Sequence, residues 1–75
     1  MNDVKKEVKI IIVKNNIDRI NQQIYDNVIA CRVGKKAGDE ELTKRATENM
    51  IKLEKNGDEY NIILKELESP QRNNG

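Results

Sequence analysis

The sequence contains no histidine, tryptophan or phenylalanine, and it has only two tyrosines and one cysteine among its 75 residues. Histidine is the commonest general base in enzymes, and tryptophan offers the best surface on which nucleic-acid bases stack. The lone Cys31 forms no disulfide within the chain and has no imidazole to activate its thiol. We therefore expect a protein that is not an enzyme and has no small-molecule substrate.

Metal ligands are equally scarce, because only carboxylates remain when histidine is absent and cysteine occurs once. The acidic pairs at 40–41 and 58–59 lack the alternating oxygen ligands of a calcium loop. Gly34 and Gly38 enclose two lysines, whereas a phosphate-binding loop follows a strand and places its lysine after the second glycine. We expect neither a metal nor any other cofactor.

Long apolar runs and an excess of one charge are also absent. The longest uncharged apolar run, residues 10–13, is far shorter than the about 20 residues that cross a bilayer, so we expect no membrane span. The net charge of +1 provides no broad attraction to nucleic acid or to an anionic membrane. No apolar stretch of signal-peptide length follows Met1, and together with the single cysteine this predicts a cytoplasmic location.

Apolar residues do recur in two series at helical spacing. Within each series, successive members are three or four residues apart, so all members lie on one side of a helix. The first series is Ile10, Val13, Ile17, Ile20, Ile24, Val28 and Cys31, and the second is Ala46, Met50, Leu53, Gly57, Tyr60, Leu64 and Leu67. We call these residues the seam, and they predict two long amphipathic helices.

The densest turn signal lies between the two series, where Gly34 and Gly38 enclose a short polar stretch before Asp39. Glycine commonly follows the last residue of a helix, and aspartate commonly caps the first turn of the next one. We predict a single domain at 1–70, made of a helix at about 4–33 with Asp3 as its N-cap, a loop at 34–39 and a helix at about 40–68, and a disordered tail at 71–75.

Two segments admit a second interpretation. Residues 8–13 are almost all β-branched and would suit a strand, but the seam spacing passes through them and no second strand is predicted to pair with them. The sequence Asn56-Gly57-Asp58 is a strong turn signal that would split the second helix. We favour one continuous helix, because Gly57 falls at a seam position and the spacing continues beyond it in phase.

A short connection makes two long helices antiparallel, which predicts an all-α helical hairpin. Residues 1–38 carry eight basic and four acidic side chains, a net +4, and residues 39–75 carry six basic and nine acidic ones, a net −3, so the two helices attract each other. Below about 80 residues a single core seldom supplies more than a few kcal/mol of stability. We therefore expect a four-helix bundle, completed by a homodimer or by a larger protein partner.

The apolar residues outside the seam indicate where such a partner binds. The predicted protein interface comprises Val8, Ile11, Ile12, Ile62 and Ile63. We expect a small interaction module, such as an adaptor, inhibitor or assembly factor, that acts by occupying a surface. Isoleucine, asparagine and lysine occur ten times each and are read from AT-rich codons, which is compatible with a phage or mobile-element origin.

An alternative function uses the polar and basic face of the first helix. The candidate nucleic-acid face comprises Asn15, Asn16, Arg19, Gln22 and Gln23, whose side chains suit contacts to phosphates, 2′-hydroxyls and base edges. In architecture and composition the chain is similar to the small dimeric helical-hairpin RNA-binding regulators of plasmid copy number, which implies RNA contact through the first helices. Asp18 and Asp26 on the same helix oppose this alternative.

One stretch resembles an enzyme family. Residues 17–24, Ile-Asp-Arg-Ile-Asn-Gln-Gln-Ile, are similar to the opening helix of the all-helical chorismate mutases, where isoleucine-aspartate pairs precede a catalytic arginine. The position that would hold this arginine is Cys31, Arg32 lies one residue off the same face, and no Arg-Glu pair follows the loop. The resemblance therefore implies an amphipathic helix, and we expect no mutase activity.

Overall fold

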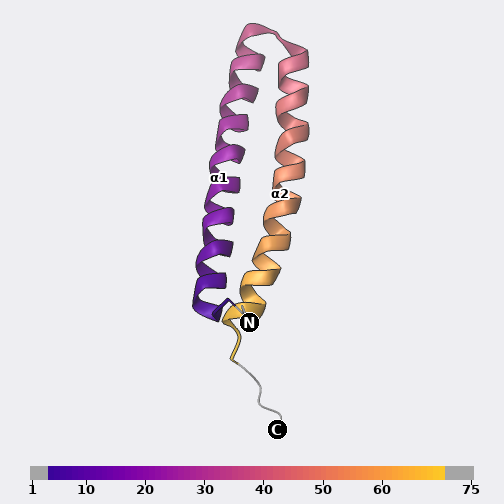
Figure 1. Cartoon of the computed structure of the whole chain (residues 1–75). Helices are drawn as coiled ribbons and strands as arrows, with labels where there is room; N and C mark the ends of the chain where they lie inside the picture. The colour runs from indigo at the N-terminus through magenta and orange to yellow at the C-terminus, as the bar shows by residue number, and fades with distance from the viewer. Residues whose placement is uncertain (1–3, 71–75) are drawn as a thin grey trace.

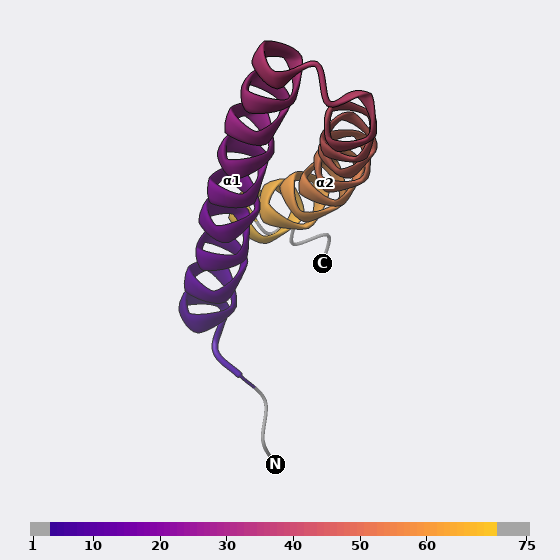
Figure 2. The ribbon, with the colours of Figure 1, turned by 90° about the horizontal axis from the view of Figure 1, so that it is seen from above.

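The computed structural model describes residues 4–70, which form two helices packed against each other as an antiparallel hairpin (Figure 1). Helix α1 spans Lys6–Ala37 and helix α2 spans Glu40–Glu68, with 32 and 29 residues respectively. Seen from above, the two helices are inclined to each other (Figure 2). The predicted all-helical hairpin is confirmed.

The turn between the helices is shorter than predicted, because α1 continues through Gly34 to Ala37 and only Gly38 and Asp39 connect it to α2. Gly38 adopts the left-handed conformation, with φ 71° and ψ 22°, which glycine enters without steric cost. Its N–H donates to Lys35 O at 3.3 Å, and the Asp39 N–H donates to Gly34 O at 2.8 Å. This pair of bonds is a Schellman cap. The helix therefore ends at the second glycine, and the predicted loop at 34–39 is corrected to 38–39.

Helix α2 begins with a complete cap at Asp39. The carboxylate Oδ1 of Asp39 accepts a hydrogen bond from the Leu42 N–H at 3.0 Å, as predicted for an N-cap aspartate. Glu40 and Glu41 add negative charge to the first turn, where it complements the helix dipole. The hydroxyl of Thr43 also donates to the Asp39 carbonyl, at 3.0 Å. The turn and the start of α2 are thus held by the same residue.

The start of α1 lacks the side-chain cap that α2 has. Its N-cap is Lys5, whose side chain makes no capping hydrogen bond. Asp3, the predicted N-cap, lies outside the described residues, as does the predicted tail at 71–75. Residues 8–13 are helical, and Asn56-Gly57-Asp58 lies inside α2 without a break, so the helical interpretation of both segments is confirmed.

The seam lies between the two helices, as its spacing predicts. Val13, Ile20 and Ala46 are buried, with exposed fractions of 7%, 6% and 2%, and the other seam residues are half-buried. Among the described residues these three are the only buried apolar side chains. Two helices alone cover one side of each seam, which leaves the hairpin with a thin core.

Candidate interaction surface

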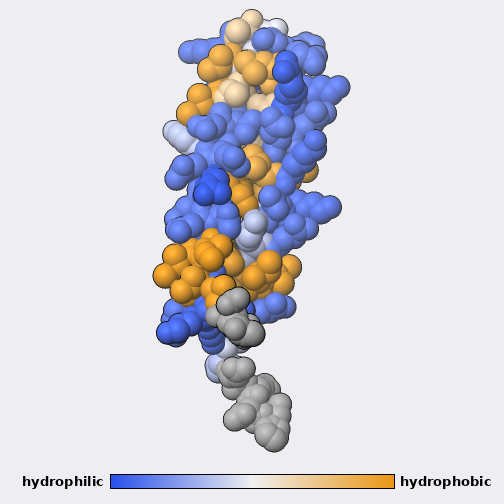
Figure 3. Space-filling view, in the orientation of Figure 1, coloured by the Kyte–Doolittle hydropathy of each residue, from blue (hydrophilic) through white to orange (hydrophobic). Residues whose placement is uncertain are grey.

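Large apolar side chains are more numerous on the surface of the hairpin than in its core. The exposed ones in the described part of the chain are Val4, Val8, Ile11, Ile12, Tyr25, Ile29, Val33, Ile51, Ile62 and Ile63, with exposed fractions from 43% to 65%. Six of these ten belong to α1, Val4 lies two residues before it, and three belong to α2. Near the open end of the hairpin, where α1 begins and α2 ends, apolar surface extends over both helices (Figure 3).

All five residues of the predicted protein interface are exposed, but they do not share one face. Successive helical residues are rotated by about 100°, so a residue two positions from a seam residue points to the opposite side of the helix. Val8 stands two residues before the seam residue Ile10, and Ile11 stands two before Val13, so both face away from α2. Ile62 precedes Leu64 and faces away from α1.

The remaining two predicted interface residues differ in position. Ile63 directly precedes Leu64, a rotation of about 100°, and lies on a flank of α2. Ile12 stands two residues after Ile10 and directly before Val13, so it lies between the outer side and a flank of α1. The five residues therefore form a belt around the open end of the hairpin, with the outer sides of α1 and α2 at opposite edges. A single flat partner surface reaches only part of this belt.

An exposed series on α1 extends well beyond the predicted interface. It continues from Val8 and Ile11 at spacings of three and four residues, on the side of α1 away from the seam. We call this series the outer stripe, and it comprises Val8, Ile11, Asn15, Asp18, Gln22, Tyr25 and Ile29, all of them exposed. Tyr25 and Val33 were not among the predicted site residues, although the unbroken spacing already connects Tyr25 to Ile11 in the sequence.

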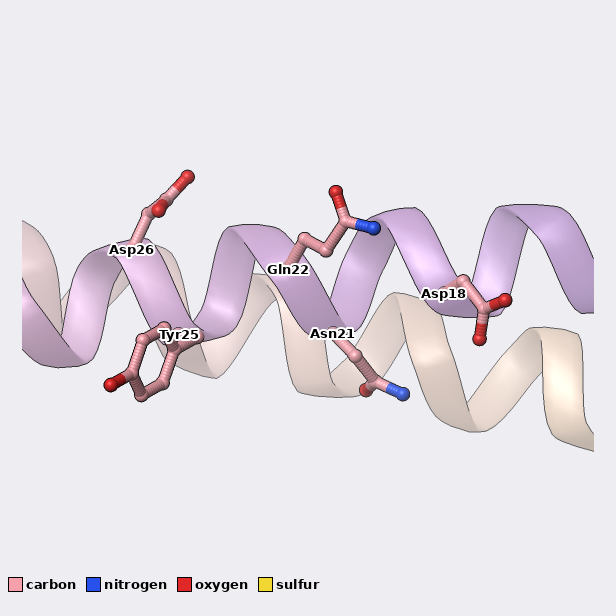
Figure 4. Close-up of a pocket in the computed structure, with 5 residues that line it drawn as sticks. All are labelled: Asp18, Asn21, Gln22, Tyr25 and Asp26. Atoms are coloured by element: carbon pink, nitrogen blue, oxygen red, sulfur yellow. The ribbon is translucent and has the colours of Figure 1, made fainter.

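The middle of the outer stripe is polar. Asp18, Gln22 and Tyr25 line a shallow hollow on α1 together with Asn21 and Asp26. In Figure 4, where α2 lies behind α1, these five side chains are spread along α1, with Gln22 and Asp26 pointing to the edge of the view away from α2. All five come from one helix, so the hollow is a feature of the helix surface and not a cleft between elements.

The candidate nucleic-acid residues lie along the exposed part of α1, with Asn16 half-buried. The side-chain amide of Asn16 donates to Ile12 O at 3.1 Å, and its Oδ1 accepts from Arg19 Nη1 at 3.3 Å. Arg19 is the one cation in this group, and Asp18 is its neighbour in sequence. Binding to a phosphate backbone requires several cations, so the group offers little electrostatic affinity for nucleic acid.

Few polar contacts link the two helices. Lys14 Nζ lies 3.5 Å from Glu68 Oε2, which is the one ion pair within residues 4–70. Both side chains are about half exposed, and exposed pairs contribute about 0–1 kcal/mol, so charge attraction between the helices is a minor part of their packing. Asn49 Nδ2 donates to Asn27 Oδ1 at 3.2 Å, and Cys31 Sγ lies 3.9 Å from Thr47 Oγ1.

Within residues 4–70, no three histidine, cysteine, aspartate or glutamate side chains are grouped as metal ligands. The same part of the chain has no helix with the length and apolar character of a membrane span. Another hollow, beside Val33, is open to solvent and is also lined by Arg32, Lys35 and Lys36. The exposed apolar faces are therefore the main surface feature of the hairpin.

Comparison with known proteins assigns no family to the chain. No family model, no curated protein and no solved structure matches it. Its function is therefore inferred from the composition and geometry of its own surface.

Proposed function

We propose that this chain is a small non-enzymatic interaction module that binds protein through the apolar outer faces of its helices. The observation that carries the proposal is the distribution of large apolar side chains, with ten exposed and three apolar residues buried in the described chain. Isolated apolar residues are common on protein surfaces, but here they recur at helical spacing along α1. A repeated apolar face is the usual signature of a helix that packs against another element.

Stability supports the same proposal. Small domains whose core supplies only a few kcal/mol are commonly stabilised by disulfides, metals or association. The single Cys31 rules out a disulfide within one chain. Fully burying an isoleucine contributes about 1.5–3 kcal/mol, and these isoleucines are about half exposed, so covering one contributes roughly half of that and covering several adds a few kcal/mol. Association therefore both stabilises the hairpin and supplies its activity.

The mechanism of such a module is occupancy of a surface. A helix presents apolar residues at spacings of three and four, and the partner, a second copy or a larger protein, covers them with its own apolar side chains. No bond is formed or broken. As an adaptor, inhibitor or assembly factor, the chain would act by holding the partner in a complex or by blocking another of its contacts.

The proposal is tested with three chemically identical substitutions. Ile11→Lys and Ile12→Lys change residues that are 56% and 50% exposed, whereas Ile17→Lys changes a half-buried seam residue. The first two variants should lose association and keep their helix content, because a charge is forced into a desolvated contact between molecules. Ile17→Lys should unfold the hairpin. Sedimentation and circular dichroism measure the two properties.

A control separates added charge from lost apolar contact. Asn21→Lys places the same cation on an exposed polar position of α1, removes no apolar side chain and should leave association unchanged. If Ile11→Lys and Ile12→Lys associate as the unmodified chain does, these isoleucines are merely exposed and the proposed function is wrong.

A further inference from the structure

The segment Asn56-Gly57-Asp58 is a strong turn signal that the fold holds inside α2. Asparagine, glycine and aspartate are all poor helix formers, and here they follow one another in the helix interior. Every residue of 54–59 except Gly57 is exposed, and Gly57 has no side chain to pack against α1. The segment is therefore held mainly by the hydrogen bonds of its own helical backbone.

The side-chain contacts that link α2 to α1 lie away from this segment. They involve Thr47 and Asn49 on one side of it and Glu68 on the other. Parts of a fold with few buried contacts open locally at a small cost in free energy, without unfolding of the rest. Residues 56–58 therefore open more readily than the adjacent turns of α2, whose seam side chains pack against α1.

The same segment contains a dipeptide with reactivity of its own. In Asn-Gly the asparagine side chain is readily attacked by the next backbone nitrogen, because glycine has no Cβ to hinder the approach. The nitrogen of Gly57 bonds to Cγ of Asn56, its proton passes to water, and the side-chain nitrogen leaves as ammonia. One water molecule then opens the five-membered succinimide. Opening at Cγ gives aspartate, and opening at the α-carbonyl gives isoaspartate.

The helix opposes this reaction. In an α-helix the N–H of residue 57 donates to the carbonyl of residue 53, so the attacking nitrogen is already engaged. The helical ψ of about −42° at Asn56 also differs from the rotated ψ that closure of the succinimide ring requires. The closed helix thus protects the asparagine, and an opening at 56–58 releases both constraints together.

We propose that Asn56 is a deamidation site whose rate is set by local opening of α2 at residues 56–58. The reaction consumes one water molecule, releases one ammonia molecule and needs no enzyme. Its rate in the folded chain is the rate in the unfolded chain multiplied by the fraction of time that the segment is open. Deamidation acts on the hairpin itself, whatever partner the exposed apolar faces bind.

The isoaspartate product changes the fold beyond the site. Its backbone runs through the former side chain and gains one atom, so the residues that follow no longer continue the helix in phase. The seam residues that lose their positions are Tyr60, Leu64 and Leu67. Ile62 and Ile63 at the open end are displaced with them. Deamidation is therefore an irreversible, time-dependent loss of the open end of the hairpin.

Peptide mapping measures the reaction in the folded chain at neutral pH and in guanidinium chloride. The tryptic peptide between Lys55 and Lys65 separates this site from the second Asn-Gly dipeptide, Asn74-Gly75. We expect product at Asn56 in both samples, formed at least about tenfold more slowly in the folded chain, and none in Asn56→Gln. Absence of product in denaturant, or equal rates in the two samples, would overturn the proposal.

Two alanine variants distinguish a local opening from unfolding of the whole hairpin. Asp58→Ala replaces an exposed, poor helix former beside the site and should slow the reaction of the folded chain about threefold, with the rate in denaturant unchanged. Asp39→Ala removes the cap at the far end of α2 and should leave the rate unchanged. A rise of about fivefold in Asp39→Ala would mean that global unfolding exposes the site, and the local opening would be wrong.

The effect on the fold is tested against a variant with the same added charge. Asn56→Asp has a normal backbone and should keep the helix content of the unmodified chain. The isoaspartate-containing chain, separated by chromatography after prolonged incubation, should lose part of α2 in circular dichroism. Equal helix content in these two proteins would contradict the predicted break in helical phase.

Discussion

Three glycines of the hairpin occupy positions with different steric demands. A Cβ at Gly34 would lie 2.5 Å from Thr43 Oγ1 and 3.0 Å from Thr43 N, because α2 starts directly against this part of α1. A Cβ at Gly38 would have open space, but the φ of 71° is unfavourable for other residues. At Gly57 a Cβ would meet Ile20 Cγ2 at 3.6 Å, an ordinary van der Waals contact. Positions 34 and 38 therefore require glycine, whereas position 57 has room for a side chain.

Alanine substitutions at Gly57 and Gly34 should change stability in opposite directions. Gly57→Ala should raise the free energy of unfolding by up to about 1 kcal/mol, since alanine is the better helix former and its methyl group fits. Gly34→Ala should lower it by about 1–3 kcal/mol, because the methyl group meets backbone atoms that cannot move aside. Urea denaturation of both variants measures the two values. Destabilisation by Gly57→Ala would contradict the continuous, uncrowded helix at that position.

The two helices differ in how the free backbone N–H and C=O groups at their ends are hydrogen-bonded. Helix α2 has a side-chain cap at Asp39, and the end of α1 has the glycine cap at Gly38, so the turn is well defined on both sides. The start of α1 at Lys5 has no side-chain cap. At the open end, the Ser69 N–H and hydroxyl both donate to Lys65 O, so α2 is capped there and the start of α1 is the end most prone to fray.

Removal of the cap at Asp39 should be measurable in the stability of the hairpin. Asp39→Ala deletes the acceptor for the Leu42 N–H and should cost about 1 kcal/mol in the free energy of unfolding. Asp39→Asn keeps a side-chain oxygen at the same place and should retain most of the stability, so it is the matched control. Urea denaturation monitored by circular dichroism compares the two. Equal stability of Asp39→Ala and the unmodified chain would mean that water replaces the cap.

Most of the secondary structure follows from sequence spacing, but the exact turn does not. The spacing of the seam predicted both helices. It also predicted that α2 continues through Gly57, since the seam spacing would have no reason to resume in phase after a break in the helix. Gly34 and Gly38 look equivalent in the sequence, and both were assigned to the loop. Only the packing of Thr43 against Gly34 and the conformation of Gly38 distinguish the glycine inside the helix from the one that ends it.

On the scale of the whole molecule, the hairpin carries apolar residues both between its helices and on its outer surface. Its inner side is the seam, and its outer sides carry the exposed apolar residues. The sequence predicted which residues remain outside the seam, such as Val8 and Ile11, because their helical phase excludes them from it. Their division between opposite edges follows from the same phase once the two seams face each other. The exposed fraction of each side chain, 43% for Val8 and 56% for Ile11, does not, because it depends on how far the neighbouring side chains cover it.

The dependence of the melting temperature on protein concentration tests the central claim most directly, namely that the apolar outer faces are covered by association. If unfolding is coupled to dissociation of two copies, the melting temperature rises with concentration. We predict a steady rise across about a hundredfold range of concentration, measured by circular dichroism at 222 nm. A monomer that melts at one temperature over this whole range would contradict association between copies as the means by which these faces are covered.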